Sequence, residues 1–199
     1  MNAIRIGEEA GLPVHVSHFK ASGKLNWGSL RLAIDQIEKA RARGLKVTAD
    51  QYPYIASSTS LEATLLPAWW REGSRSALQD RRKDPQLTQR IRDDVLKELE
   101  SASRIRLVSC GFNRRWIGSS IDEVAKSENR ETVDIVLDIE RNGGASVINF
   151  GMHEDDLQLA MPLSWVATAS DGGGEDSNMQ PAASSIVRHI SEKDWPLCH

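Results

Sequence analysis

The chain has 199 residues, of which 40% are hydrophobic and 27% are charged. This composition is typical of a globular protein of one or two domains and excludes an intrinsically disordered chain. The net charge of −3 and the isoelectric point near 6.0 provide no bulk attraction to nucleic acid or to an anionic membrane.

The sequence shows neither a membrane-spanning segment nor a signal peptide. No apolar run approaches the ~18 residues of a membrane span, and the opening stretch MNAIRIGEEAGLPV lacks the apolar core of a signal peptide. The two cysteines, Cys110 and Cys198, are too few for a disulfide scaffold. We therefore expect a cytoplasmic protein with no nucleic-acid or membrane partner.

Helix and strand patterns alternate over the first part of the chain. Residues 2–10 have the pattern of a helix, and residues 13–18, PVHVSH, follow as a short strand. A helix over about 27–43 presents a stripe of apolar side chains, with Asn26 as its N-cap and Gly44 as its C-terminal cap. The segment LKVTADQYPY is then a second strand. This order predicts two parallel strands joined by a crossover helix.

The middle of the chain is less regular. The stretch QYPYIASSTS is interpreted as a loop. Asp84 and Pro85 begin a helix, and Ser120 with Glu123 forms a capping box at the start of another. Periodicity predicts the remaining elements, which are the strands RIRLVSC, ASVINFG and SWVATASDGGG, a helix over about 131–141 and a short helix at EDDLQLAM.

Polar side chains stand at the ends of three predicted strands. His18 and Lys20 end the first, Asp50 and Tyr52 end the second, and Asp171 precedes a glycine triplet after the last. In parallel α/β folds, ligand sites gather at the carboxyl ends of the strands. Imidazole and carboxylate both suit zinc, and a lysine offers a positive charge to an anionic group. The five residues are therefore candidates for one site.

Structural roles for the same residues stay open at this point. A single histidine at a strand end is more often structural or solvated than a ligand, and Lys20 alone is typical of a protein surface. Asp171 before glycines is equally typical of a turn. Asp50 could cap or hydrogen-bond a neighbouring loop. His15 alternates with apolar residues and is interpreted as a hydrogen-bonded histidine of the core or of an interface.

Three strings carry a resemblance to a known family: VHVSHFKASGKLNWG, AIDQIEKARARGLKVTADQYPYIASSTSL and WVATASDGG. In this order they resemble the N-acyl-D-amino-acid deacylases (D-aminoacylases) of the amidohydrolase superfamily. The resemblance includes LLPAWWREG and RWIGSSIDEVA. It implies an α/β fold, the second half of a (β/α)8 TIM-type barrel with an irregular helical insertion, over residues 1–177. Residues 178–199 would be a divergent or truncated tail.

The resemblance also implies a role for each candidate residue. His18 would be a zinc ligand at the end of the sixth barrel strand, and Asp171 would be the catalytic acid/base on the last strand. Lys20 would bind the substrate carboxylate, and Tyr52 would lie near the substrate. The implied cofactor is Zn²⁺. The implied substrate is a small N-acyl-D-amino acid, whose amide bond the complete enzyme hydrolyses.

The chain departs from the family pattern in two places. The HxH or HxD motif, the cysteine ligand and the second histidine of the family have no counterpart before His18, and no His-Pro-Arg motif follows Asp171. A catalytic zinc site needs about three protein ligands. We therefore expect the chain alone to be inactive, to retain no zinc and to self-associate through exposed barrel edges.

Two alternatives to this function remain at the level of the sequence. One is an amidohydrolase of cyclic amides, similar to dihydroorotases or hydantoinases, which needs a carboxylated lysine between two metals. The other is a non-catalytic α/β module that binds a small anion or a partner protein.

Overall fold

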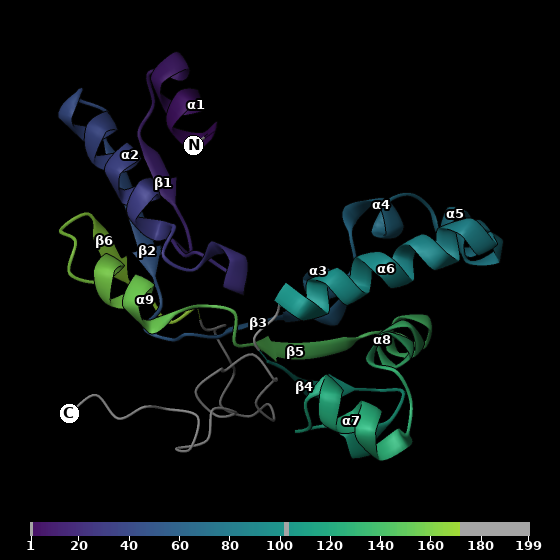
Figure 1. Ribbon diagram of the computed structural model, residues 1–199. Helices are drawn as coiled ribbons and strands as arrows, with labels where there is room; N and C mark the ends of the chain where they lie inside the picture. The colour runs from purple at the N-terminus through teal and green to yellow at the C-terminus, as the bar shows by residue number, and fades with distance from the viewer. Residues whose placement is uncertain (1, 102–103, 172–199) are drawn as a thin grey trace, which may run out of the picture. The chain divides into compact units, whose positions relative to one another are not determined.

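The computed structural model describes residues 2–101 and 104–171, which form two compact units (Figure 1). The first unit holds the described residues up to Ile55 and those from Gly151 onward. The second unit holds those from Ala56 to Phe150. The predicted tail, 178–199, lies outside the described residues. Within the described ranges, no helix has the length and apolar character that a bilayer crossing requires.

A parallel sheet of three strands, in the order β1-β2-β6, forms the centre of the first unit. β1 (Val14–Val16) and β6 (Val166–Thr168) each pair in parallel with β2 (Val47–Gln51). The parallel pairing of the first two strands, predicted from the sequence, is confirmed. The last described strand joins the same sheet beside β2.

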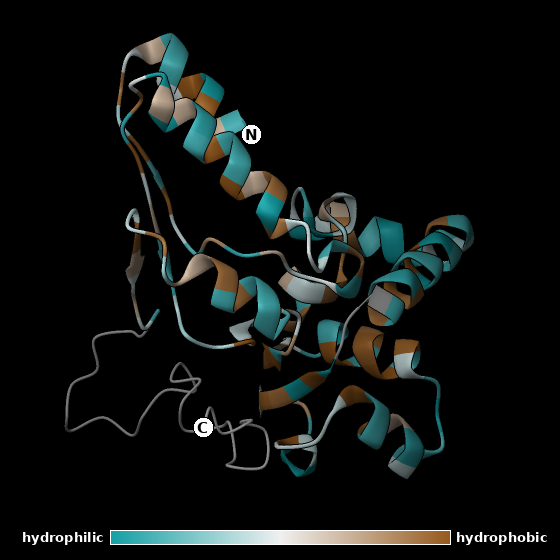
Figure 2. Ribbon diagram, turned by 60° about the vertical axis from the view of Figure 1, so that its left-hand side comes forward, coloured by the Kyte–Doolittle hydropathy of each residue, from teal (hydrophilic) through white to brown (hydrophobic). Residues whose placement is uncertain are grey.

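Helices cover one face of this sheet. They are α1 (Asn2–Ala10), α2 (Leu30–Ala42) and α9 (Glu154–Ala160). The short 3-10 helix η1 (Lys24–Asn26) lies between β1 and α2 and has no buried residue. Ile34 and Ile37 of α2 pack against Val47 and Ala49 of β2 in one apolar cluster. Full burial of each isoleucine contributes roughly 1.5–3 kcal/mol. Figure 2 shows the hydrophobic and hydrophilic patches that alternate along these helices.

The start of α2 differs from the prediction. The helix begins at Leu30, and the interpretation of Asn26 as its N-cap is wrong, because the Asn26 side chain donates to the Ser22 carbonyl at 2.7 Å instead. Gly28, with φ 80°, adopts a left-handed conformation that no helix can include. The C-terminal end agrees with the prediction, since Gly44 has φ 97° directly after the C-cap residue Arg43.

The opposite face of the sheet carries polar side chains. Thr48 and Asp50 alternate along β2 with the buried Val47 and Ala49. His15 is paired in register with Thr48 and is exposed, so its assignment to the core is corrected. It is nevertheless hydrogen-bonded, as expected, because both of its ring nitrogens have partners on β2.

The second unit contains an antiparallel sheet in the order β3-β5-β4. β3 (Ser57–Ser60) and β4 (Ile105–Cys110) each pair with β5 (Ala145–Asn149). The interpretation of QYPYIASSTS as a loop is therefore wrong over its last four residues. The predicted insertion contains this sheet as well as helices. The pairing partner of β3 is β5, which lies far along the chain, so no local pattern indicates that Ser57–Ser60 form a strand.

The helices of the second unit enclose one apolar core. They are α3 (Leu61–Leu65), α4 (Ala68–Arg71), α5 (Arg75–Lys83), α6 (Pro85–Ser101), the 3-10 helix η2 (Arg114–Trp116), α7 (Ile121–Glu128) and α8 (Thr132–Arg141). The predicted start of α6 is confirmed, because the Asp84 carboxylate accepts the Gln86 N–H at 2.8 Å. Ile91, Val133 and Val147 are completely buried in this core.

The predicted capping box at α7 is confirmed and yields a test of stability. The Ser120 hydroxyl accepts the Glu123 N–H, and the Glu123 carboxylate accepts the Ser120 N–H at 2.7 Å, which lowers the pKa of Glu123. We expect Ser120→Ala to lower the free energy of unfolding by about 1 kcal/mol. Because the folded pKa is depressed, the contribution of the Glu123 charge is present above pH 4.5 and is lost as the pH falls through the folded pKa.

The measurement is urea unfolding, followed by the amide signals of α7, for wild type, Ser120→Ala and Glu123→Gln. The cost of Glu123→Gln should be seen at neutral pH and should shrink at pH values well below 4.5. A cost that is independent of pH would contradict the assignment of the charge to this cap.

Candidate functional site

The carboxyl edge of the parallel sheet gathers the residues that the sequence singled out. His18 follows β1, Tyr52 follows β2 and Asp171 follows β6, so all three leave the sheet at the same edge. The Nε2 atom of His18 lies 3.0 Å from Oδ1 of Asp171. The ammonium nitrogen of Lys20 lies 5.0 Å from the centre of the Tyr52 ring, and the rings of His18 and Tyr52 are 6.1 Å apart.

The backbone is constrained where two of these side chains leave it. His18 has φ 54° and Asp171 has φ 51°, and a left-handed conformation costs most residues with a side chain about 1–2 kcal/mol, although aspartate adopts it more readily than most. Among the described non-glycine residues, Asn129 also has a positive φ, but it ends α7, where this conformation is common. Such strained residues often mark functional sites.

Asp50 supports the turn that carries His18. Its Oδ1 accepts the backbone N–H of His18 at 2.8 Å, and its Oδ2 lies 2.7 Å from Nε2 of His15. The hydrogen bond from the His18 N–H, followed by that from His15, holds the pKa of Asp50 below its ordinary value of 3.8. Asp50 therefore hydrogen-bonds the neighbouring loop, which was one of its two possible roles in the sequence.

Lys20 is half-buried beside the ring of Tyr52, which is 1% exposed. Burial lowers the pKa of Lys20 from its ordinary value of 10.5, and the nearby carboxylates of Asp171 and Asp50 act in the opposite direction. The contact with the ring face adds an attraction of about 0.5–2 kcal/mol. The ammonium group thus lies near both carboxylates. Among the described contacts, it forms no ion pair with either of them.

The loop that follows Lys20 is fastened to the start of α9. The backbone N–H of Gly23 and the indole N–H of Trp27 both donate to the Gly151 carbonyl, at 2.8 and 2.9 Å. The N–H of Gly28 donates to the Asp156 carboxylate at 2.8 Å. Sequence reasoning missed Asp156, because three acidic residues at a helix start predict only a favourable interaction with the helix dipole.

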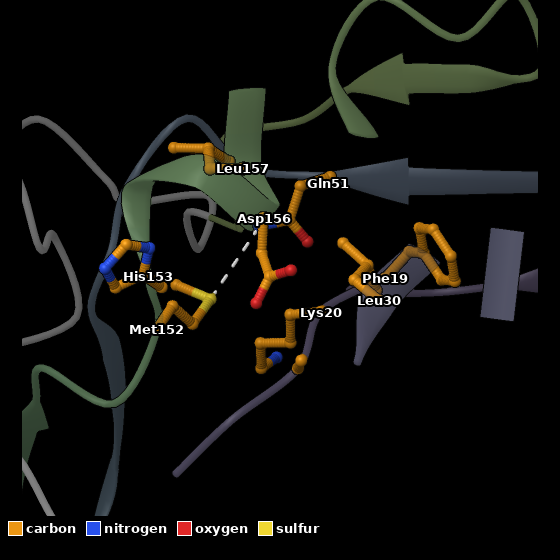
Figure 3. A pocket seen from close by; sticks show the side chains of 9 residues that line it. Phe19, Lys20, Leu30, Gln51, Met152, His153, Asp156 and Leu157 are labelled. Carbon is orange, nitrogen blue, oxygen red and sulfur yellow. Dashed lines mark hydrogen bonds between the residues drawn. The ribbon is translucent and has the colours of Figure 1, made fainter. Parts of the chain in front are cut away.

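Lys20 is one of the residues that line a small cavity (Figure 3). Its volume is about 10 Å³, close to the space that one water molecule needs, so it is too small for an amino-acid substrate. Figure 3 shows the side chains of Lys20, Gln51 and Asp156 converging on it from three segments. Gln51 donates to the Tyr52 carbonyl at 2.9 Å and contacts the sulfur of Met152 at 4.0 Å. The cavity therefore belongs to the packing that supports the site.

His18 and Asp171 supply the kinds of donor that zinc accepts. An imidazole nitrogen and a carboxylate oxygen that approach to 3.0 Å could both reach one metal ion. Within the described ranges, however, no group of three or more His, Cys, Asp or Glu side chains is placed to hold a metal. The two donors fit zinc in type, but a catalytic site needs about one more ligand.

Comparison with known proteins identifies relatives of the chain. No protein-family model matches it. D-aminoacylase of Alcaligenes xylosoxydans xylosoxydans is 29% identical over 177 residues, which are 89% of this chain and 29% of that protein. N-acyl-D-glutamate deacylase of the same organism is 25% identical over 178 residues, with the same coverage. The chain thus spans less than a third of the length of the curated relatives it matches.

Solved structures agree with these relatives. A D-aminoacylase described as defining a novel subset of amidohydrolases has a TM-score of 0.58 at 26% identity, over 85% of this chain and 28% of that chain. A D-aminoacylase studied for its binuclear metal centre matches to the same extent. N-acyl-D-glutamate deacylase from Bordetella bronchiseptica, complexed with zinc and a phosphonate inhibitor, has a TM-score of 0.61 at 24% identity over 85% of this chain and 28% of its own, which supports the fold alone.

The relatives to which the chain is similar are amidohydrolases, which are hydrolases. The chain is similar in particular to D-aminoacylases, so the resemblance predicted from the motifs is confirmed, as is the α/β fold. The individual roles of His18, Lys20, Tyr52 and Asp171 stay predictions.

The proximity of Lys20 to Asp171 can be tested by titration. The ε-carbon signal of Lys20 in ¹³C-lysine-labelled protein should titrate below 10.5. Asp171→Asn should lower this pKa further, because it removes a negative charge that favours the ammonium form. Asp155→Asn, at an exposed carboxylate on α9, is the control and should leave the signal unchanged. An unchanged or raised pKa in Asp171→Asn would show that the two groups are not neighbours.

Proposed function

We propose that the chain supplies the carboxyl-terminal part of a zinc-dependent hydrolase that cleaves the amide bond of N-acyl-D-amino acids. The observation that carries the proposal is the approach of His18 Nε2 to Asp171 Oδ1 at 3.0 Å, on the edge where Lys20 and Tyr52 also meet. The names of the curated relatives favour linear N-acyl amino acids over the cyclic amides of dihydroorotases and hydantoinases. They equally favour an enzyme over a non-catalytic binding module.

The four side chains have different parts in the proposed reaction. The Lys20 ammonium, held against the Tyr52 ring, binds the carboxylate of the substrate. His18 would be the main zinc ligand, with Asp171 as a weaker second donor, and the bound metal would polarise the scissile carbonyl. Asp171 takes a proton from the attacking water, whose oxygen bonds to the carbonyl carbon. The same carboxyl group then gives the proton to the amide nitrogen as the carbon–nitrogen bond breaks.

The surrounding fold would be the second half of a (β/α)8 barrel. In such barrels the catalytic residues lie at the carboxyl ends of neighbouring parallel strands. The parallel neighbours β1, β2 and β6, with the candidate residues after their carboxyl ends and α2 packed on one face of the sheet, support this part of the proposal. The open, polar face of the sheet would then be the inner face of the barrel. A cytoplasmic location for the complete enzyme remains a prediction from the sequence.

The first test uses the 199-residue chain alone. We expect it to lose zinc on dialysis and to release no amino acid from N-acetyl-D-amino acids, because two donors do not make a tight site. We also expect it to self-associate, since β1 and β6 are the edges of the described sheet. The measurements are zinc per chain, a ninhydrin assay and sedimentation velocity. Zinc-dependent turnover by this chain would contradict the ligand assignment.

The second test uses a full-length protein that contains the chain. His18→Ala should lose metal and activity together, whereas Asp171→Ala should keep most of the metal and lose roughly 10²–10⁴-fold in turnover. The reason is that His18 is assigned to metal binding and Asp171 mainly to proton transfer. Zinc content and released amino acid are measured on each variant.

Asp155→Ala is the matched control, because it removes an exposed carboxylate on α9 that is 87% accessible. It should change neither zinc content nor turnover. Full activity of Asp171→Ala, or full zinc content of His18→Ala, would overturn the proposed division of roles.

A further inference from the structure

The backbone at His18 needs an external support. Its φ of 54° is unfavourable for any residue with a side chain, and His18 does not end a helix, where left-handed residues are common. If this torsion relaxed to a negative value, the Cα–Cβ bond would turn and carry the imidazole away from Asp171. The 3.0 Å approach of the two side chains therefore depends on whatever holds this torsion.

Asp50 holds the two amide groups that flank the torsion. The N–H of His18 donates to Asp50 Oδ1 at 2.8 Å, and the next N–H, that of Phe19, donates to the Asp50 carbonyl at 2.8 Å. The two successive N–H groups thus donate to two different atoms of the same residue, a carboxylate oxygen and a backbone carbonyl oxygen. A hydrogen bond to an ionised carboxylate is about twice as strong as a neutral one.

His15 holds the carboxylate in turn. Its Nε2 lies 2.7 Å from Asp50 Oδ2, and its Nδ1 lies 2.8 Å from the Thr48 hydroxyl. The three side chains share the polar face of the sheet, since His15 is in register with Thr48 and Asp50 follows two residues later. With one oxygen engaged by the His18 N–H and the other by His15, both oxygens of Asp50 already have partners within the protein.

We propose that Asp50, oriented by His15, is a positioning residue that holds His18 in its left-handed conformation and thereby aims the imidazole at Asp171. Asp50 acts through His18 and does not itself contact the substrate. The conformational part stands on the geometry alone, whereas its consequence for zinc binding rests on the proposed function.

A double-mutant cycle in the 199-residue chain separates the effect of the backbone torsion at His18 from the effect of its imidazole. Asp50→Ala is combined with His18→Gly and, separately, with His18→Ala. Both substitutions delete the imidazole, but glycine alone adopts a positive φ without cost. Unfolding in urea is followed by the amide signals of β2, which report on the first unit.

We expect Asp50→Ala to shift the unfolding equilibrium toward the unfolded state in wild type and in His18→Ala. In His18→Gly this shift should be larger by roughly fivefold or more in the equilibrium constant, because wild type and His18→Ala recover the strain of the positive φ when the torsion relaxes, whereas glycine has no strain to recover. Asp50→Asn, which keeps an oxygen for the His18 N–H, should recover part of the effect. Asp35→Ala, at an exposed carboxylate of α2, is the control and should cost the same in every background. Equal effects of Asp50→Ala in the glycine and alanine backgrounds would overturn the proposal.

A milder variant covers the case in which Asp50→Ala does not fold. His15→Ala removes an exposed side chain, and it should accelerate hydrogen exchange of the His18 amide while leaving the Phe19 amide, which donates to a backbone carbonyl, unchanged. Equal exchange of the His18 amide in both proteins would remove His15 from the proposal. Zinc content of full-length Asp50→Ala is measured last. A positive cycle with no zinc in the full-length wild type would refute the proposed function and leave the positioning role intact.

Discussion

Parallel pairing along β2 is the constraint on which the candidate site depends. β2 is the middle strand, and its register with β1 on one side and β6 on the other places the ends of all three strands at one edge. His18 and Asp171 lie far apart in the sequence and meet there. A slip of one residue would turn Asp50 toward the helices and Gln51 toward the open face, which would remove the support of the His18 turn. The burial of Val47 and Ala49 against α2 opposes such a slip.

Much of the first unit could be predicted from the sequence, because its signals are local. The apolar stripe of α2, the glycine after it and the polar residues at the strand ends all depend on neighbours in the chain. The resemblance to D-aminoacylases then indicated which polar residues belong together. Their approach in space agrees with that expectation, although their chemical roles remain proposals.

The features that could not be predicted all depend on partners distant in sequence. β3 is a strand because Ser57–Ser60 pair with β5, and this stretch has no apolar alternation of its own. Asp156 fastens the loop at Gly28, but its own surroundings in the sequence indicate only a helix start. His15 alternates with two valines, and this pattern correctly predicts that His15 lies on the opposite face of the strand from them. Only the register with β2 shows that its partners are Thr48 and Asp50.

The open face of the parallel sheet and its two edge strands differ in how they affect the association of the chain. A face lined by His15, Thr48 and Asp50 is well solvated, so exposing it costs little. The unpaired backbone groups of the edge strands β1 and β6 are different, because they offer hydrogen bonds to any extended chain. Association of this chain would therefore proceed through main-chain pairing at the edges and not through an apolar surface of the sheet.

The second unit begins and ends at neighbouring points. Ser57 pairs directly with Asn149, and in the first unit the N–H of Met152 donates to the Ile55 carbonyl at 3.1 Å. In the sequence of the first unit, the stretch from Ala56 to Phe150 is thus one long insertion between β2 and α9, and its two ends lie close together. Each doubling of such a connection costs only about 0.6 kcal/mol of closure entropy. Evolution can therefore add, enlarge or replace the second unit as a whole, while β1, β2 and β6, which carry the candidate site, keep their register.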